Sequence, residues 1–275
     1  MSEDQPTPRE PRRTEARNEK ARKLESFTTR QILELMNDED ATVPAAVRAA
    51  LPAIEDAVEE IVKALHAGHR LRYIGAGTSG RLGVLDASEA PPTFGVDEDI
   101  VRGIMAGGDG ALRHAVEGAE DDSSAGARAA RDHVRSGDVL VGISASGRAK
   151  FVTAAMVMAR ELGARTVALT CDDSSPLAKD ADITIAVDVG PEVLAGSSRL
   201  KAGTATKLVL NLLSTAAMIR SGRTRGDLMV DLRPTNAKLK ERAIRMVRDE
   251  AGISEDEAQA RLEAADWSVR KALER

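Results

Sequence analysis

The chain has 275 residues, of which 42% are hydrophobic and 2% aromatic, so it is long enough for one large or two modest domains with an aliphatic core. Its net charge of −5 argues against a general nucleic-acid binder, because such domains present a basic face. The single cysteine, Cys171, excludes an internal disulfide, the four histidines show no metal-ligand spacing, and no apolar run approaches the length of a membrane span. With a charged N-terminus that lacks an apolar signal-peptide region, these features predict a cytoplasmic protein.

The first part of the chain is predicted to be a charged tail followed by helices. Residues 1 to about 25 hold Pro, Glu, Arg and Lys with almost nothing apolar, which favours a disordered tail. Thr29–Met36 is predicted to be a short helix. Apolar residues then recur at intervals of three and four from Val47 to Leu65, which predicts one long amphipathic helix that ends at Gly68.

The stretch from Leu71 to Gly95 reads LRYIGAGTSGRLGVLDASEAPPTFG. It predicts a strand at Leu71–Ile74, a glycine-rich turn and the start of a helix at Leu82–Ala87. Such a junction directs free backbone N–H groups and a helix N-terminus at one point, where an anion fits.

The turn holds three glycines with the GxGxxG spacing of dinucleotide-binding loops: Gly75, Gly77 and Gly80. The next strand-like run ends without the acidic residue that would hold a ribose, and Arg81 stands where the Walker A pattern needs lysine. The loop instead carries two hydroxyls, Thr78 and Ser79, which with backbone donors suit a terminal phosphate monoester. The alternative is a tight strand-to-helix turn without a ligand.

The rest of the chain alternates β-rich and helical patterns. Further strands are predicted at Ile100–Met105, Asp138–Ile143, Thr166–Thr170 and Ile183–Val187. Helices are predicted at Ala111–Ala119, Ala125–Val134, Phe151–Leu162 and Lys201–Ile219. This order predicts an α/β fold with a doubly wound parallel sheet of about five strands, which binds ligands at the carboxyl ends of the strands. We therefore assign residues 26–235 to the main domain and residues 236–275 to a small appendage of three helices.

A second loop repeats the features of the first. The strand that ends at Ile143 is followed by Ser144, Ala145, Ser146 and Gly147, and then by a helix. Two such loops at adjacent strand ends would surround one sugar phosphate. Arg81 has two candidate partners, the phosphate or a core carboxylate such as Asp86.

On these two loops the chain resembles a sugar isomerase (SIS) domain. Within that group it resembles the N-acetylmuramic acid 6-phosphate etherases. The motifs that carry the resemblance are GAGTSGRLGVLDASEAPPTFG, AVEGAEDD, GISASGR and GSSRLKAGTATKLVLN, which stand in this order. The resemblance extends from about residue 25 to about residue 251.

The resemblance implies a lyase that removes D-lactate from N-acetylmuramic acid 6-phosphate by elimination and then adds water. This chemistry needs an acid and a base but no metal or redox cofactor. The family's motifs make Glu89 the acid that protonates the departing lactate and Glu120 the base. We expect the apolar and proline-rich surroundings of Glu89 to bury it, which would raise its pKa and keep it protonated.

The resemblance also implies the residues that hold the substrate and the state of assembly. The phosphate-binding residues are expected to be Thr78, Ser79, Ser144, Ser146 and Gly147. Further contacts to the substrate are expected from Gly77, Glu192, Ser197, Ser198 and Lys201, with the two serines starting the last long helix. The expected partners are a phosphosugar and a second copy of the chain in a homodimer, with no nucleic acid and no membrane.

Two other functions remain open at this stage. A sugar-phosphate isomerase on the same fold would also use a base at carbon 2, but would not need both glutamates. A non-catalytic sensor of sugar phosphates, like the regulatory protein of glucokinase, would bind the phosphosugar without turnover. The presence of both Glu89 and Glu120 favours the etherase.

Overall fold

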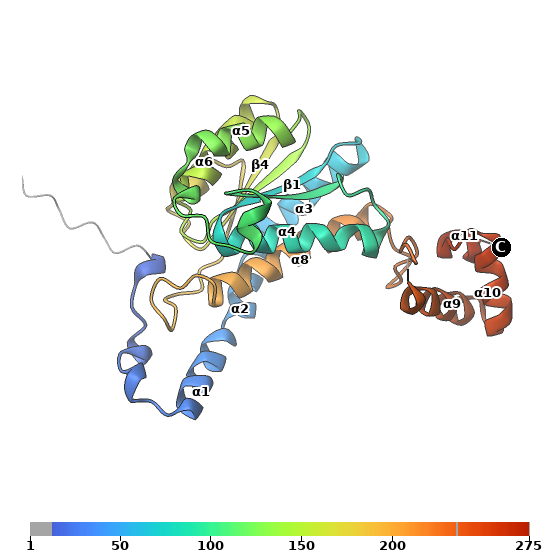
Figure 1. Ribbon diagram of the computed structural model, residues 1–275, viewed down its shortest axis with the longest axis horizontal. Coiled ribbons are helices and arrows are strands. Elements are labelled where there is room, and N and C mark those ends of the chain that lie inside the picture. Colours follow the sequence, from blue (N-terminus) through green and yellow to red (C-terminus); the bar gives the residue numbers. More distant parts are fainter. Residues whose placement is uncertain (1–12, 235, 275) are drawn as a thin grey trace, which may run out of the picture.

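The computed structural model describes residues 13–234 and 236–274, and these contain a five-stranded parallel sheet (Figure 1). The strands lie in the order β2-β1-β3-β4-β5. Their bounds are Leu71–Gly75 (β1), Val101–Met105 (β2), Val139–Ile143 (β3), Arg165–Thr170 (β4) and Ile183–Ala186 (β5). In the register of the central strand, Tyr73 lies opposite Gly103 of β2 and Val141 of β3. The predicted α/β fold with a parallel sheet of about five strands is confirmed.

Helices cover both faces of the sheet, since β1 and β3 are buried along their whole length and need apolar cover on each side. On one face lie α3 (Leu51–His66), α4 (Gly77–Phe94) and α8 (Lys201–Arg220). On the other face lie α5 (Ser123–His133), α6 (Lys150–Glu161) and α7 (Pro176–Asp180). Both faces therefore have their own hydrophobic core.

Helix α8 packs against α3 and α4 (Figure 1). A hydrogen-bonded cluster around the Asp86 carboxylate of α4 ties these layers together. The carboxylate accepts from Tyr73 Oη (3.0 Å), Asn211 Nδ2 (2.7 Å) and Ser214 Oγ (3.2 Å). Burial, followed by the nearby charge of Asp86, raises the pKa of Tyr73 well above its ordinary value.

The expectation that no apolar run approaches the length of a membrane span needs a correction at α8. Among the described residues, Lys201–Arg220 is long and apolar enough to pass that test by length and composition. However, 56% of its most apolar stretch is buried inside the fold, as in the core helix of a globular protein. Its hydrophobicity is accounted for by packing on α3 and α4.

The N-terminal region is more ordered than the sequence predicted. Residues 1–12 of the expected tail lie outside the described residues, but residues 13–26 contain three short 3-10 helices. Helix α1 (Thr29–Asp40) begins with a capping box between Thr28 and Gln31 and extends beyond Met36, where the predicted helix ended. The single long helix expected next is two, α2 (Val43–Ala49) and α3, because Pro52 lacks the N–H that would continue the first helix.

The helix predicted at Ala111–Ala119 is also absent from the described residues. Short 3-10 helices occupy Asp109–Leu112 and Ala119–Asp121, and a turn joins them. Arg81 fixes the first of these, since it donates to the carbonyl oxygens of Ala111 (2.8 Å) and Leu112 (3.0 Å). In this structure Arg81 contacts these two carbonyl oxygens rather than Asp86, one of the two partners considered for it.

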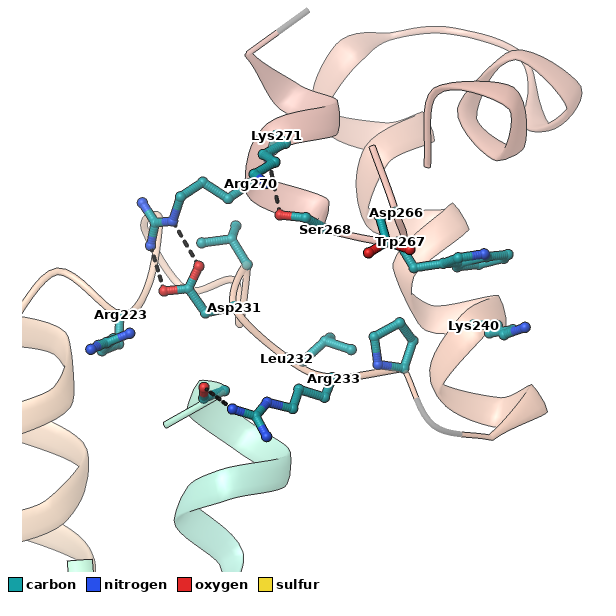
Figure 2. A pocket seen from close by; sticks show the side chains of 13 residues that line it. Arg223, Asp231, Leu232, Arg233, Lys240, Asp266, Trp267, Ser268, Arg270 and Lys271 are labelled. Atoms are coloured by element: carbon teal, nitrogen blue, oxygen red, sulfur yellow. Dashed lines mark hydrogen bonds and ion pairs between the residues drawn. The ribbon is translucent and has the colours of Figure 1, made fainter. Parts of the chain in front are cut away.

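The C-terminal helices form a separate small bundle beyond the end of α8 (Figure 1). It consists of α9 (Ala237–Ala251), α10 (Glu255–Ala264) and α11 (Val269–Leu273). Its core includes Val230 and Leu232, which precede the boundary predicted at residue 236. Arg270 of α11 donates to both carboxylate oxygens of Asp231, at 2.7 and 2.8 Å, and so ties the bundle to the segment that leads into it (Figure 2).

Candidate functional site

The candidate site lies where the strand order reverses, at the carboxyl ends of β1 and β3. Successive strands lie on opposite sides of β1, so the loops after β1 and β3 diverge and leave a crevice. A cavity of about 270 Å³ occupies this place. Its lining includes Gly77, Thr78, Ser79, Glu120, Ser144, Ser146 and Ser198. Seven of the residues singled out from the sequence thus come together.

The first loop places the N-terminus of α4 at the cavity. Gly77 has φ +54°, a left-handed conformation that favours glycine. Gly75 and Gly80 pack so closely that a Cβ on Gly75 would lie 2.6 Å from the backbone nitrogen of Gly80. The glycine spacing therefore allows the strand and the helix to pack closely, with Thr78 and Ser79 at the cavity. The 18-residue helix directs its positive end to the same point.

The second loop packs its glycine against the neighbouring strand end. Gly147 has φ +63°, and a Cβ there would lie 2.1 Å from Ser175 Oγ. Its backbone N–H donates to Ser144 O at 2.9 Å, which closes a tight turn. Ser144 and Ser146 line the cavity, whereas Gly147 lies outside the lining and shapes the turn.

Glu120 lies at the boundary between two cavities. It belongs to the 3-10 helix Ala119–Asp121 and lines both the 270 Å³ cavity and a neighbouring one of about 210 Å³. Its side chain is exposed, so it can reach a ligand in either space. The adjacent Asp121 is engaged elsewhere, in an ion pair with Lys150 at 3.5 Å.

Glu89 is not buried, contrary to the expectation. It is exposed on α4, outside the lining of the 270 Å³ cavity, and one turn from the exposed Leu85. At about 1.5 Å per residue, Glu89 lies about 18 Å along the helix from Gly77. The adjacent apolar residues that suggested burial, Ala90 and Phe94, instead point into the core. The two glutamates are therefore apart within one chain.

Glu192 and Lys201 lie outside the lining of the 270 Å³ cavity and are occupied by other contacts. The Glu192 carboxylate accepts from the backbone N–H groups of Lys201 and Ala202, at 3.0 Å each, and so caps α8. Lys201 is 3% exposed, and its Nζ lies 2.7 Å from the carboxylate of Glu39 on α1. Both residues therefore hold α8 in place in this structure.

Ser197 and Ser198 precede α8 rather than starting it, because the helix begins at Lys201. Ser198 lines the 270 Å³ cavity, and Ser197 does not. The loop turns back at Ser197, whose N–H donates to Leu194 O at 2.9 Å. The glycine of this loop, Gly196, also lines the cavity.

Thr14 and Glu15 line the 270 Å³ cavity and were missed by the sequence analysis, which assigned them to the tail. Two contacts hold their segment against the core. Asn18 Nδ2 donates to Pro191 O at 3.4 Å, and Lys20 Nζ lies 3.0 Å from the same Glu39 that pairs with Lys201. No local pattern in the sequence indicates that this segment packs against the core.

Cys171 has no environment for nucleophilic chemistry. It is buried, and desolvation, followed by the charges of Glu192 and Asp188, raises its pKa to about 12. A thiol with this pKa stays protonated near neutral pH. Cys171 is therefore a small buried residue of the core.

Comparisons with known proteins identify SIS-domain relatives of this chain. A family model for the glucokinase regulatory protein N-terminal SIS domain matches residues 53–160, and a SIS domain model matches residues 120–216. An N-acetylmuramic acid 6-phosphate etherase from Yersinia pestis is 50% identical over 261 residues, which cover 94% of this chain and 88% of the relative. The chain belongs to the N-acetylmuramic acid 6-phosphate etherase family. An etherase from Yersinia pseudotuberculosis shows the same identity and coverage.

As a member of the etherase family, the chain is a carbon–oxygen lyase with a SIS domain. This relationship favours the etherase over the isomerase and the sensor that the sequence left open. Solved phosphoheptose isomerases share the fold. The protein from Neisseria gonorrhoeae has a TM-score of 0.53 at 21% identity, and the alignment covers 69% of this chain and 98% of that one. One from Francisella tularensis has a TM-score of 0.54 at 19% identity, with coverage of 70% and 100%.

Proposed function

We propose that this chain cleaves the D-lactyl ether of N-acetylmuramic acid 6-phosphate in the cytoplasm, giving N-acetylglucosamine 6-phosphate and D-lactate. The observation that carries the proposal is the 50% identity to an etherase across 94% of the chain. The chemistry of the 270 Å³ cavity supports it. Its hydroxyls and the helix N-terminus suit a phosphate, and the carboxylate of Glu120 also lines the cavity.

In the proposed mechanism, the phosphate lies against the two loops and anchors the open-chain sugar. Thr78, Ser79, Ser144 and Ser146 would donate hydrogen bonds to it, with the N–H groups at the start of α4. The aldehyde at carbon 1 acidifies the proton on carbon 2. Glu120 would remove that proton, and it is the one carboxylate of the two assigned glutamates that lines the cavity.

The elimination also needs an acid at the ether oxygen on carbon 3. As the carbon–oxygen bond breaks, Glu89 would protonate that oxygen and D-lactate would leave. Water then adds its hydroxyl to carbon 3 while its proton returns to Glu89, and the proton held by Glu120 returns to carbon 2. Each glutamate finishes in its starting protonation state, as a catalyst must.

We infer that Glu89 reaches the reaction from a second copy of the chain. Within one chain it is about 18 Å along α4 from the phosphate loop, farther than the few ångströms that separate the groups of one sugar. Exposed apolar side chains lie on the same two packed helices, α4 and α8: Leu85 at 55% and Leu212 at 38% exposure. An interface over this surface would cover them and would exclude water from Glu89, so that the acid meets the ether oxygen out of contact with solvent.

The experiment is an incubation with N-acetylmuramic acid 6-phosphate in heavy-oxygen water, with products read by mass spectrometry. We expect D-lactate without label and N-acetylglucosamine 6-phosphate with the label on carbon 3. Label in the lactate would mean that a different bond is cut, and would overturn the mechanism. Absence of turnover would overturn the proposed function.

A further inference from the structure

A second large cavity lies far from the strand ends, between the main domain and the C-terminal helices. We call it the basic cleft. It has a volume of about 680 Å³, within the range of roughly 300–1,000 Å³ typical of small-molecule sites. Its walls come from the end of α4, the segment after α8 and the bundle of α9 and α11 (Figure 2).

The cleft carries an excess of positive charge. Five cationic side chains line it: Arg223, Arg233, Lys240, Arg270 and Lys271. Two carboxylates, Asp231 and Asp266, stand against them. The chain as a whole has a net charge of −5, so the excess of three cations around this cavity is a local concentration of positive charge.

Most of these cations lack a carboxylate partner. Asp231 is fully engaged by Arg270. In residues 13–234 and 236–274, no ion pair joins Arg223, Lys240 or Lys271 to an acidic group, and Arg233 donates to the carbonyl oxygen of Gly95 at 3.1 Å. Unpaired cations around a cavity favour an anionic ligand, and guanidinium groups favour phosphate.

The basic cleft also has an apolar wall. Trp267, the only tryptophan of the chain, lines it beside the buried Val230 and Leu232. Asp266 and Trp267 have φ of +51° and +59°, and they are the only non-glycine residues with positive φ in the described part of the chain. Such a conformation costs of order 1–3 kcal/mol per residue and is held by its surroundings. Lys240 Nζ lies 4.6 Å from the centre of the indole ring.

Hydrogen bonds of Arg270 and Arg233 hold the walls of the basic cleft in place. Arg270 holds Asp231 and also donates to Gly222 O at 2.7 Å, while its backbone N–H donates to Val230 O at 3.2 Å. Together with the contact between Arg233 and Gly95, these bonds join the bundle to the main domain on two sides of the opening (Figure 2). A site whose walls are preformed loses less conformational entropy when a ligand binds.

We propose that the basic cleft is a second ligand site, which binds a sugar phosphate. The cations would take the phosphate, and the indole and apolar wall would take the carbon face of the sugar ring. The choice of a sugar phosphate, rather than another phosphorylated molecule, rests on the proposed function. Binding would bridge the main domain and the C-terminal bundle.

The single tryptophan makes the test specific to this site. We would titrate the protein with N-acetylglucosamine 6-phosphate and follow the fluorescence of Trp267. A saturable change is expected. The double variant Arg223→Glu/Lys271→Glu should weaken this binding roughly a hundredfold or more, because two charge-assisted contacts are lost. Arg128→Glu/Lys179→Glu, which makes the same charge change at exposed positions elsewhere, should leave it intact.

Two further arms separate this site from the catalytic one. The variant Ser79→Ala/Ser146→Ala should lose turnover but keep the fluorescence change. If the change disappears in that variant, the signal comes from the catalytic cavity and the proposal is overturned. Absence of a saturable change in the natural protein overturns it as well, whether or not the protein is an active etherase.

The ligand class has its own controls. Unphosphorylated N-acetylglucosamine should give no saturable change at the same concentrations, and inorganic phosphate should bind more weakly than the phosphosugar. Equal binding of the neutral sugar would overturn the role of the cations, and equal binding of phosphate would overturn the role of the indole. If the charge-reversed variant does not fold, Arg223→Ala/Lys271→Ala provides the same test with a smaller loss.

Discussion

Glu120 lies beside the phosphate loops, and its proposed role as base can be tested by an isosteric change. Glu120→Gln keeps the shape but cannot accept the proton from carbon 2. We expect turnover to fall about a hundred- to ten-thousand-fold, while binding of N-acetylglucosamine 6-phosphate persists. Asp121→Asn is the matched control, because that neighbouring carboxylate pairs with Lys150 at the surface. Near-normal turnover in Glu120→Gln would show that another group is the base.

Glu15 lies on the N-terminal segment and lines the same cavity. A carboxylate there would repel the phosphate, so we expect it to accept hydrogen bonds from sugar hydroxyls. Glu15→Gln should lower kcat/KM roughly tenfold to a hundredfold, since a hydrogen bond to a charged group is lost. Glu19→Gln, on the same segment but outside the cavity lining, should have little effect. Equal losses in both variants would mean that the segment matters only as a whole.

The residues of the two loops were predictable, because each lies within a few positions of a strand end and the loop pattern itself implies a phosphate. Thr78, Ser79, Ser144 and Ser146 all line the cavity. The position of Glu15 was not predictable. Its place at the cavity depends on contacts between Asn18 and Pro191, which are 173 positions apart, and no local pattern encodes such a pairing.

At the scale of elements, a buried ion pair joins α1 to the start of α8. Lys201→Met would remove the buried partner of Glu39. The mostly buried Glu39 carboxylate would then have only the exposed Lys20 as an ion-pair partner. We expect the free energy of unfolding to fall by about 3–5 kcal/mol, because an unpaired buried charge is costly. Urea denaturation measures the change. The double variant Glu39→Leu/Lys201→Met should recover much of the loss.

The same pair makes a prediction about pH. Burial opposes the charge of Glu39, but hydrogen bonds from Lys201 and Lys20 outweigh burial and hold its pKa below the ordinary value of 4.5. A group whose pKa is lowered by folding stabilises the fold above its unfolded-state pKa. The difference in unfolding free energy between the natural protein and Glu39→Gln should therefore be constant near neutral pH and shrink as the pH falls below about 4.5. A difference that grows in acid would contradict this.

The sheet and most helices followed from hydrophobic periodicity, and the failures have local causes. The segment 111–119 has helix-forming residues, but the bonds from Arg81 to the carbonyl oxygens of Ala111 and Leu112 hold it in a tighter turn. The break between α2 and α3 was missed because the apolar spacing continues across Ala50. Hydrophobic periodicity indicates which side of a segment is buried, but it does not indicate where a helix is interrupted.

For the molecule as a whole, the proposed homodimer makes a prediction that mixing can test. Glu89→Ala and Glu120→Ala should each be inactive alone. When the two are unfolded together and refolded, about a quarter of the sites should combine an intact Glu89 from one chain with an intact Glu120 from the other. Turnover near that fraction supports shared sites. No recovery, in a mixture whose dimers are shown to have exchanged, would mean that each chain supplies both glutamates.

The placement of α8 affects how the chain folds during synthesis. The helix spans residues 201–220, yet it covers α3 and α4, which are made much earlier. At roughly 5–20 residues per second, about 7–30 s pass between the completion of β1 and the end of α8. Throughout that interval the apolar surface of α3 and α4 that α8 covers in the fold lacks this cover. The nascent protein is therefore expected to depend on chaperones, and truncations before residue 220 should aggregate.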